Sequence, residues 1–394
     1  MASLRSSRAV AVAAVTFATF TDIVAYSIAI PVLPDLGQKL GASPTMIGLL
    51  FGSFGVTLLA VSIPMGAASD RVGRKLPMVA GLLALAASTL LFAFGDSLPW
   101  LFAARLVQGA ADAVTWVIGF ALIADLYGPD ERGRVTGIVM SGTSIAVMIG
   151  PSIGGWLYEA GGMRLPFLIV SLLALIGAAV FVWYDTPRHR EAREAVPIVA
   201  VLRLPAVAIC TALVVAVAST LSMIEPTVAM HLQVNLHLRP ARVGLVFAAC
   251  ALANTMFHPF FGRLSDRLGA RPMAFAGLFA TAAPLPLLGR IWSFESAIAL
   301  GVLQFAALAV VITPSLGYMV EATSSGGIES FGVSYGIFNM AWAVGLLAGP
   351  ALGGFLFERV GFTRVFTVWA PGLALVAIVL ARAQFKRLPS REAV

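Results

Sequence analysis

Four charged side chains lie inside long apolar stretches of this chain: Asp22, Arg105, Asp112 and Glu225. Placing an Asp or Arg in hydrocarbon costs about 2.5–3.5 kcal/mol on insertion scales, so such residues usually line a cavity and carry function. Burial also disfavours the charged form of a carboxylate. Asp22 and Glu225 are therefore expected to take up a proton whenever no cation lies beside them.

Arg105 and Asp112 belong to one polar stripe. Together with Gln108 and Gly109 they are spaced at i, i+3, i+4 and i+7, which places all four on one face of a helix. We expect this face to look into a cavity, where Arg105 and Asp112 would take part in a proton relay. A static network within the helix is the alternative.

Two more helix faces combine polar and aromatic residues. Asp22 shares a face with Tyr26, and Asn339 shares one with Tyr335 and Trp342. Aromatic rings attract organic cations through cation–π contacts. Packing or contact with lipid is the alternative for each ring. The candidate aromatic residues are Tyr26, Phe54, Trp116, Tyr335 and Trp342.

The charges on these faces give a net negative lining, because three carboxylates stand against one arginine. Such a lining favours cationic ligands. A proton and an organic cation then compete for the same carboxylate, which is the minimum requirement for exchanging one for the other. For Asp22 and Glu225, the alternative is a structural role, with each carboxylate buried against a hydroxyl or an amide.

Membrane helices are the elements that must position these residues. Of the 394 residues, 59% are hydrophobic and 11% are charged, whereas soluble domains carry about 25% charged residues. Apolar runs of about 20 residues cross a bilayer, and there the backbone has to be helical to satisfy its polar groups. Twelve such spans are predicted, near 9–33, 45–68, 76–95, 98–125, 134–158, 165–184, 205–231, 242–264, 272–289, 294–319, 331–357 and 362–383.

Two strings of the first half return in the second half. GAASDRVGRK at 66–75 recurs as GRLSDRLGAR at 262–271, and GPSIGG at 150–155 recurs as GPALGG at 349–354. Parallel repeats of a membrane unit are typical of transporters. The sequence therefore predicts an all-α membrane protein with two six-helix bundles, 1–186 and 205–394, related by a pseudo-two-fold axis. A charged cytoplasmic linker at 187–204 joins them; a short surface helix there is the alternative.

The net charge of +7 reflects topology. With both termini in the cytoplasm, 18 basic residues lie inside and 7 outside, and Arg105 lies within a span. The positive-inside rule then fixes this orientation, and no nucleic-acid partner is needed. Cys210 and Cys250 fall inside spans, so neither a disulfide framework nor a metal site is implied. The absence of Asn-x-Ser/Thr sequons favours a bacterial plasma membrane, and a monomer is expected.

Several strings resemble motifs of one transporter family. GAASDRVGRK is similar to the signature loop between the second and third spans of the major facilitator superfamily, and RLVQG at 105–109 resembles its next motif. GPSIGG, with Gly142, resembles the antiporter motif that is associated with exporters. FTD at 20–22 and PVLP at 31–34 resemble span one of the twelve-span drug:proton antiporters. The resemblance runs nearly end to end and implies the fold of that family.

Within the superfamily the chain resembles the vesicular monoamine transporter branch. IEP at 224–226, PSLGY at 314–318 and YGIFN at 335–339 carry this resemblance. The branch has a lysine in span two, where this chain has Phe54, and acidic residues in spans ten and eleven, where Ala309 and Asn339 align. This chain therefore has fewer proton-carrying groups than that branch, and we expect Asp112 to replace some of them. The identity of the cargo and the number of protons exchanged stay open.

The resemblance also implies gating residues. In the family the signature loop is a cytoplasmic latch that forms when the carrier faces outward; a topological anchor is the alternative. The glycines permit close helix approach, the aspartates cap a helix or pair with arginine, and the Gly-Pro pairs permit a bend, as a moving hinge or a static kink. The implied gating residues are Gly66, Asp70, Arg71, Arg74, Arg132, Gly150, Pro151, Asp266, Arg267, Gly349 and Pro350.

The sequence therefore predicts a proton-coupled antiporter that exports amphipathic or amine-containing organic cations, multidrug or monoamine-like, by alternating access. Asp22 and Glu225 would bind cation and proton in turn, and Arg105 would bias their ionisation. The expected partners are the cation, protons and lipid, with no cofactor. An exporter of a neutral metabolite, such as a sugar or amino acid, is the alternative. A membrane enzyme or receptor is a third hypothesis, and no His-Glu-x-x-His string occurs in the spans.

Overall fold

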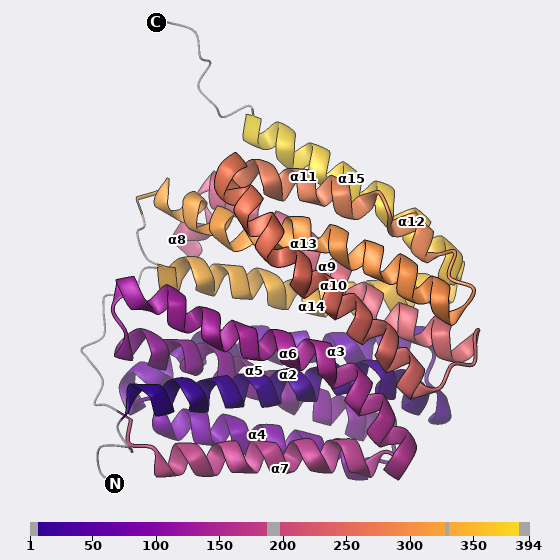
Figure 1. Cartoon of the computed structure of the whole chain (residues 1–394), viewed down its shortest axis with the longest axis horizontal. Helices are drawn as coiled ribbons and strands as arrows, with labels where there is room; N and C mark the ends of the chain where they lie inside the picture. Colours follow the sequence, from indigo (N-terminus) through magenta and orange to yellow (C-terminus); the bar gives the residue numbers. More distant parts are fainter. Residues whose placement is uncertain (1–6, 187–197, 328–330, 386–394) are drawn as a thin grey trace, which may run out of the picture.

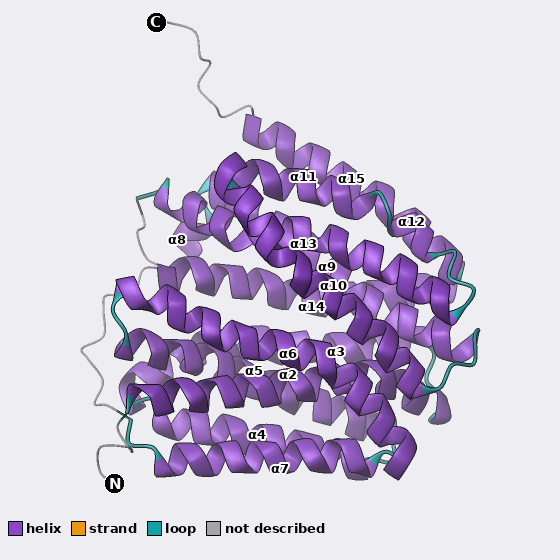
Figure 2. Ribbon diagram, viewed as in Figure 1, coloured by secondary structure: helices purple, strands orange, loops and turns teal. Residues whose placement is uncertain are grey.

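A computed structural model describes residues 7–186, 198–327 and 331–385 of the chain. All regular secondary structure in these ranges is helical (Figure 2), which confirms the predicted all-α class. The first half contains α2 (Arg8–Lys39), α3 (Pro44–Val72), α4 (Lys75–Phe94), α5 (Leu98–Leu126), α6 (Pro129–Gly161) and α7 (Arg164–Trp183). The second half contains α8 (Ile198–Leu202), α9 (Pro205–Val234), α10 (Pro240–Leu268), α11 (Ala270–Ala282), α12 (Leu285–Leu288), α13 (Phe294–Ser324), α14 (Phe331–Val360) and α15 (Phe362–Phe385).

Within the described ranges, eleven helices are long and apolar enough to cross a membrane. The ninth predicted span, 272–289, differs from the prediction because it is divided between α11 and α12. Pro284 and Pro286 explain the division, since proline has no N–H to donate and its ring clashes with the preceding helical turn. Most of the predicted linker, 187–197, lies outside the described residues, and α8 occupies part of the remainder.

The two signature strings form the same tight turn. Gly73 follows α3 and Gly269 follows α10, with φ angles of 84° and 92°. Glycine adopts this left-handed region without the steric penalty that a Cβ brings. The turn lets α4 and α11 start almost directly after the preceding helix, so each pair of consecutive helices is antiparallel.

Helix packing repeats between the halves (Figure 1). In the first half α2 packs on α6, α3 on α5 and α4 on α7, and we call this set the N-terminal bundle. In the second half α9 packs on α14, α10 on α13, and α11 and α12 on α15, which forms the C-terminal bundle. The order of partners is the same in both, as expected from the sequence repeat.

A serine joins the same two helices in each bundle. The Ser27 hydroxyl of α2 lies 3.5 Å from a backbone carbonyl oxygen of α6, and the Ser222 hydroxyl of α9 lies 3.0 Å from one of α14. Gly150 and Gly349, the glycines of the two Gly-Pro pairs, face these serines, and a Cβ on either glycine would overlap the hydroxyl. Both glycines therefore act at least as close-packing positions.

The bundles meet mainly where α3 packs on α14 and α6 packs on α10, with α2 and α9 between them. We call the end of the molecule where α2 begins and α15 ends the terminal end. The opposite end, which carries the loops at 40–43 and 235–239, we call the far end (Figure 1).

Candidate functional site

Asp22 and Asp112 lie side by side between α2 and α5. Asp22 is 1% exposed and Asp112 is 7% exposed. Their carboxyl groups are within hydrogen-bonding reach of each other. The Trp116 indole Nε1 donates to Asp22 Oδ2 at 3.1 Å, whereas Asp22 Oδ1 is buried and receives no donor from the described part of the chain. The site therefore holds two adjacent carboxyl groups with one oxygen unsatisfied.

Glu225 is bound across the junction of the bundles. The Tyr26 hydroxyl of α2 donates to Glu225 Oε2 of α9 at 2.7 Å. Tyr26 lies one helical turn beyond Asp22 on the same face of α2, as the spacing predicts. One face of α2 thus carries a carboxyl group, that of Asp22, and a hydroxyl group, that of Tyr26, which donates a hydrogen bond to a carboxylate of the other bundle.

Arg105 lies in an aromatic cage and is fully buried. Its guanidinium carbon lies 4.7 Å from the ring centroid of Phe51, 5.5 Å from that of Tyr26 and 5.7 Å from that of Phe54. Its Nη1 donates to Gln108 Oε1 at 2.9 Å. Among the described residues, Nε and Nη2 of Arg105 and Nε2 of Gln108 find no acceptor. The stripe predicted on α5 therefore faces the interior with spare hydrogen-bond donors.

A row of aromatic rings runs from the carboxyl pair toward the terminal end. Trp116 contacts Phe120 with ring centroids 5.6 Å apart, and Phe120 of α5 contacts Tyr335 of α14 at 5.3 Å. The second of these contacts joins the two bundles. Trp342 stacks on Phe338 with ring centroids 5.9 Å apart.

The close packing of α3 on α5 depends on Gly109. A Cβ at this position would overlap the backbone carbonyl of Phe54. Since Phe54 forms part of the cage of Arg105, the absence of a side chain at Gly109 lets α3 bring the ring to the guanidinium. This is the packing reason for a glycine beside Gln108 in the predicted stripe.

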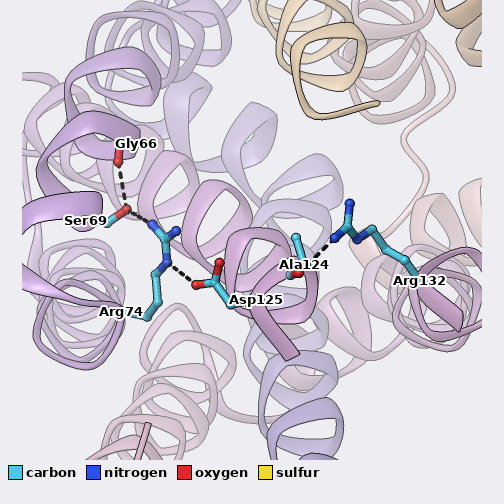
Figure 3. A network of polar contacts seen from close by, with 6 residues as sticks. All are labelled: Gly66, Ser69, Arg74, Ala124, Asp125 and Arg132. Carbon is cyan, nitrogen blue, oxygen red and sulfur yellow. Dashed lines mark hydrogen bonds and ion pairs between the residues drawn. The ribbon is translucent and has the colours of Figure 1, made fainter. Parts of the chain in front are cut away.

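The signature loop is bound to its own bundle (Figure 3). Arg74 Nε donates to Asp125 Oδ2 at 2.8 Å. The same guanidinium donates to the Ser69 hydroxyl, which donates to the Gly66 carbonyl oxygen at 2.9 Å. Arg132 Nη2 donates to a backbone carbonyl at the end of α5 at 2.9 Å. These bonds tie α3, α4, α5 and α6 together at the terminal end.

The other predicted gating residues are placed differently. Arg71, Asp266 and Arg267 are exposed, and the side chain of Asp70 lies outside the described part. Between residues that the structure describes, Asp266 and Arg267 form no side-chain hydrogen bond or ion pair. Pro151 and Pro350 lie inside α6 and α14, where these helices meet the opposite bundle.

The structure brings together most of the predicted site and adds two residues to it. Asp22 meets Asp112 and Trp116, whereas Arg105 lies beside Tyr26 and Glu225 and not beside the carboxyl pair. Asn339 makes no side-chain hydrogen bond to another described residue, and Trp342 contacts Phe338. The two residues that the sequence analysis missed are Phe51 and Phe120. A usable signal existed for Phe120, which is four residues after Trp116 on the same helix face.

In the described chain no three His, Cys, Asp or Glu side chains are grouped as a metal site would require. A duplicated helical membrane unit that carries carboxylates among its spanning helices defines a secondary transporter and not an enzyme. The chain belongs to the Major Facilitator Superfamily, whose sequence profile matches residues 15–224 and 207–393. The resemblance expected from the motifs is thereby confirmed.

Curated relatives are similar over most of the chain. The human MFS-type transporter SLC18B1 is 26% identical over 384 residues, covering 90% of this chain and 82% of that protein. The mouse synaptic vesicular amine transporter is 26% identical over 362 residues, covering 89% and 68%. A probable vesicular acetylcholine transporter-B of Danio rerio is 27% identical over 390 residues, covering 92% and 78%. These relatives confirm a distant relationship to the vesicular amine transporter branch.

Solved structures share the fold. A bacterial homologue of the human lysosomal transporter Spinster, in an inward-facing and unoccupied conformation, superposes with a TM-score of 0.81 at 15% identity, covering 98% of this chain and all of the other. The human organic anion transporter MFSD10 superposes with a TM-score of 0.70 at 19% identity, covering 94% and 99%. At these identities the likeness establishes the fold alone.

Proposed function

We propose that the chain is a proton-coupled antiporter that exports amphipathic or amine-containing organic cations by alternating access. The observation that carries this proposal is the placement of three carboxyl groups inside the helical membrane unit, two of them buried and the third, Glu225, half-buried. Asp22 and Asp112 form an adjacent pair, and Glu225 reaches across the junction to Tyr26. The proposal depends on the ability of these carboxyl groups to bind either a proton or an organic cation.

The pair of Asp22 and Asp112 can hold one proton or one cation. Two adjacent carboxylates in a low-dielectric site do not both ionise, because their like charges repel. A proton shared between them satisfies the otherwise unpartnered Asp22 Oδ1 through a carboxyl-to-carboxylate hydrogen bond. An organic cation beside the pair supplies the same neutralisation, so cation and proton exclude each other.

The bond from Tyr26 to Glu225 links occupancy to conformation. A hydrogen bond to a charged acceptor contributes about 1.5–3 kcal/mol. Because α2 and α9 belong to different bundles, separating the bundles at this level breaks the bond. An ionised Glu225 therefore favours the closed junction, and a proton or cation on Glu225 weakens that preference.

The cargo would meet Trp116 and Tyr335. The faces of Tyr26 and Phe54, expected from sequence to contact a cation, already surround Arg105. Trp116 touches Asp22, and Tyr335 closes the aromatic row on the other bundle. A cation that is paired with the Asp22–Asp112 site therefore has aromatic surface beside it from both bundles, which favours amphipathic amines.

The relatives support an amine cargo. Two of them are named for transporting amines or acetylcholine in vesicles, and both kinds of molecule carry a nitrogen cation at neutral pH. This chain shares about a quarter of its residues with them. We therefore propose the cargo class, a nitrogen cation with an apolar body, and no particular compound.

Export follows from the proposed orientation. We propose that both termini lie in the cytoplasm and that the membrane is a bacterial plasma membrane; the excess of basic residues at the terminal end supports this orientation. The bundles are bonded at the far end, through Thr45 to Glu358 and Ala241 to Glu159. With the far end outside, this conformation is the inward-facing one, in which an exporter loads cargo. A monomer contains the whole site.

Flux of ethidium and of simple monoamines in proteoliposomes with an imposed pH gradient tests the proposal. The wild-type protein should drive uphill cation movement against proton movement. A variant with both Asp22→Asn and Glu225→Gln should lose gradient-driven flux, while Asp96→Asn, at an exposed loop position, should keep it. Gradient-independent flux in the wild type, or unchanged coupling in the double variant, would contradict the proposal.

A second candidate is export of a neutral polar metabolite. The unpartnered donors of Arg105 and Gln108 favour it, because they suit the hydroxyl or carbonyl oxygens of a sugar or amino acid. In that case the carboxylates would carry only the proton. The two candidates separate in a protection assay: organic cations should shield Asp22 from carboxyl-modifying reagent only if they bind there.

A further inference from the structure

The far end is closed by two copies of one contact between the bundles. In each copy, the first turns of a helix from one bundle lie against the last turns of a helix from the other. One copy joins α3 to α14, and the other joins α10 to α6. The residues involved are related by the internal repeat of the sequence.

Glycines bring the backbones together in both copies. Where α3 meets α14, a Cβ on Gly48 would overlap the Pro350 carbonyl, and a Cβ on Gly354 would overlap the Pro44 carbonyl. The corresponding positions are Gly244 against Pro151 and Gly155 against Pro240 where α10 meets α6. The strings SPTMIG at 43–48 and RPARVG at 239–244 align at the same offset as the signature loops.

A carboxylate completes each copy. Glu358, near the end of α14, accepts the backbone N–H of Thr45 in the first turn of α3 at 3.0 Å. Glu159, near the end of α6, accepts the backbone N–H of Ala241 in the first turn of α10 at 2.9 Å. The first N–H groups of a helix lack intrahelical partners and carry positive dipole charge, so an anion there is favourable. Each bundle thus caps a helix of the other.

We propose that Glu159 and Glu358 are the latches of the far-end gate, and that they set the balance between its closed and open conformations. Both are exposed at the helix ends and do not contact the buried carboxyl groups, so they would position the bundles and not bind cargo. This inference rests on the alternating-access part of the proposed function. It requires neither the organic cation nor the proton.

The distribution of hydrogen bonds between the bundles supports a gate at this end. Besides the two latches, the hydrogen bonds between the bundles are Tyr26 to Glu225 and Gln233 Nε2 to the Pro31 carbonyl oxygen at 2.6 Å, among the residues that the structure describes. None of these four bonds lies at the terminal end. Opening the far end therefore breaks both latches and leaves the backbone N–H groups of Thr45 and Ala241 without their carboxylate acceptors.

Double electron–electron resonance in nanodiscs tests the proposal. Spin labels at Gln38 and Val234 report the far end, and labels at Arg134 and Leu268 report the terminal end; all four positions are exposed. Loss of one side-chain cap typically costs about 1 kcal/mol, so Glu159→Ala or Glu358→Ala should each raise the open-to-closed ratio at the far end about fivefold. The double variant should show about the product of the two effects. Glu321→Ala, an exposed carboxylate at the terminal end, is the matched control.

Unchanged far-end distances in folded Glu159→Ala and Glu358→Ala would overturn the proposal. If the alanine variants do not fold, Glu159→Gln and Glu358→Gln keep an acceptor but lose the charge, and should give a smaller shift in the same direction; no shift would again overturn it. Failure of the cation–proton proposal looks different, because flux would then ignore the pH gradient while the latch variants still changed the distances.

Discussion

Asp22 and Glu225 differ in what surrounds them, and this difference makes their roles separable. Asp22 is paired with a second carboxyl group, whereas Glu225 is held by a hydroxyl from the other bundle. Substitution of Asp22 should therefore act on cargo binding, and substitution of the Glu225 contact should act on conformation.

Asp22→Asn should lower the affinity for a bound organic cation about a hundredfold. The reason is the loss of a buried charge-assisted contact, of about 3 kcal/mol. Equilibrium binding of a fluorescent amine by the purified protein measures the effect. An affinity within threefold of wild type would show that the cation binds elsewhere.

Tyr26→Phe should weaken the junction without removing a charge. It deletes the hydroxyl that binds Glu225 and keeps the ring against Arg105. A double-mutant cycle with Glu225→Gln, read by the far-end distance distribution, should give a coupling energy of about 1.5–3 kcal/mol. Tyr184→Phe is the matched control, because the Tyr184 hydroxyl is buried without a partner in the described chain. A coupling near zero would contradict the proposed link.

Spacing along the chain predicted the faces of these residues and not their partners. The i, i+3, i+4, i+7 stripe of Arg105 to Asp112 does face the interior. Which residue of another helix meets each position depends on the rotation and depth of both helices, and periodicity does not encode these. The contact of Tyr26 with Glu225 and the cage from Phe51 around Arg105 therefore appeared only in the structure.

The glycines of the membrane helices differ in whether the packing around them leaves room for a side chain. Gly109→Ala should lower the free energy of unfolding by about 1–3 kcal/mol, because its Cβ would overlap the Phe54 carbonyl and force α3 from α5. Gly137→Ala, on α6 with no atom within 4 Å of its Cβ, should be neutral or stabilising by about 0.5–1 kcal/mol. Thermal unfolding in detergent compares the two. Equal midpoints would contradict the packing argument.

The helices themselves were predictable from apolar run length, and the exception has a local cause. The span predicted at 272–289 is one apolar run, but Pro284 and Pro286 divide it into α11 and α12. Hydropathy measures the free energy of transfer to lipid and does not take into account the backbone N–H group that proline lacks. The break is readable from the prolines once backbone bonding is considered beside hydropathy.

At the scale of the whole molecule, the structure extends the repeat to helix contacts that the sequence analysis did not predict. Gly48 lies opposite Pro350 in the same relation as Gly244 to Pro151, because duplicated helices pack in the same way. The repeat could not predict where symmetry fails. Asp22 and Arg105 have no charged counterpart on the second bundle, so the site is built mainly on the first, with Glu225 as the contribution of the second.

The proposed orientation, with both termini in the cytoplasm, is open to a direct check. A green fluorescent protein fused after Val394 should fluoresce, because it folds in the cytoplasm, and alkaline phosphatase fused there should be inactive. Fusions ending in the loop at 40–43 should give the opposite pattern. A fluorescent far-end fusion together with an active C-terminal phosphatase would contradict the proposed orientation. The far end would then face the cytoplasm, and the direction of transport proposed here would be reversed.

Proton release on cargo binding tests the central claim most directly. Purified protein in weakly buffered solution with a pH indicator is mixed with a saturating organic cation. The account predicts that protons are released as the cation binds, that release is lost in the Asp22→Asn, Glu225→Gln variant, and that Asp96→Asn releases them as the wild type does. Cation binding to the wild-type protein without proton release would contradict the account, because cargo and proton would then not share a site.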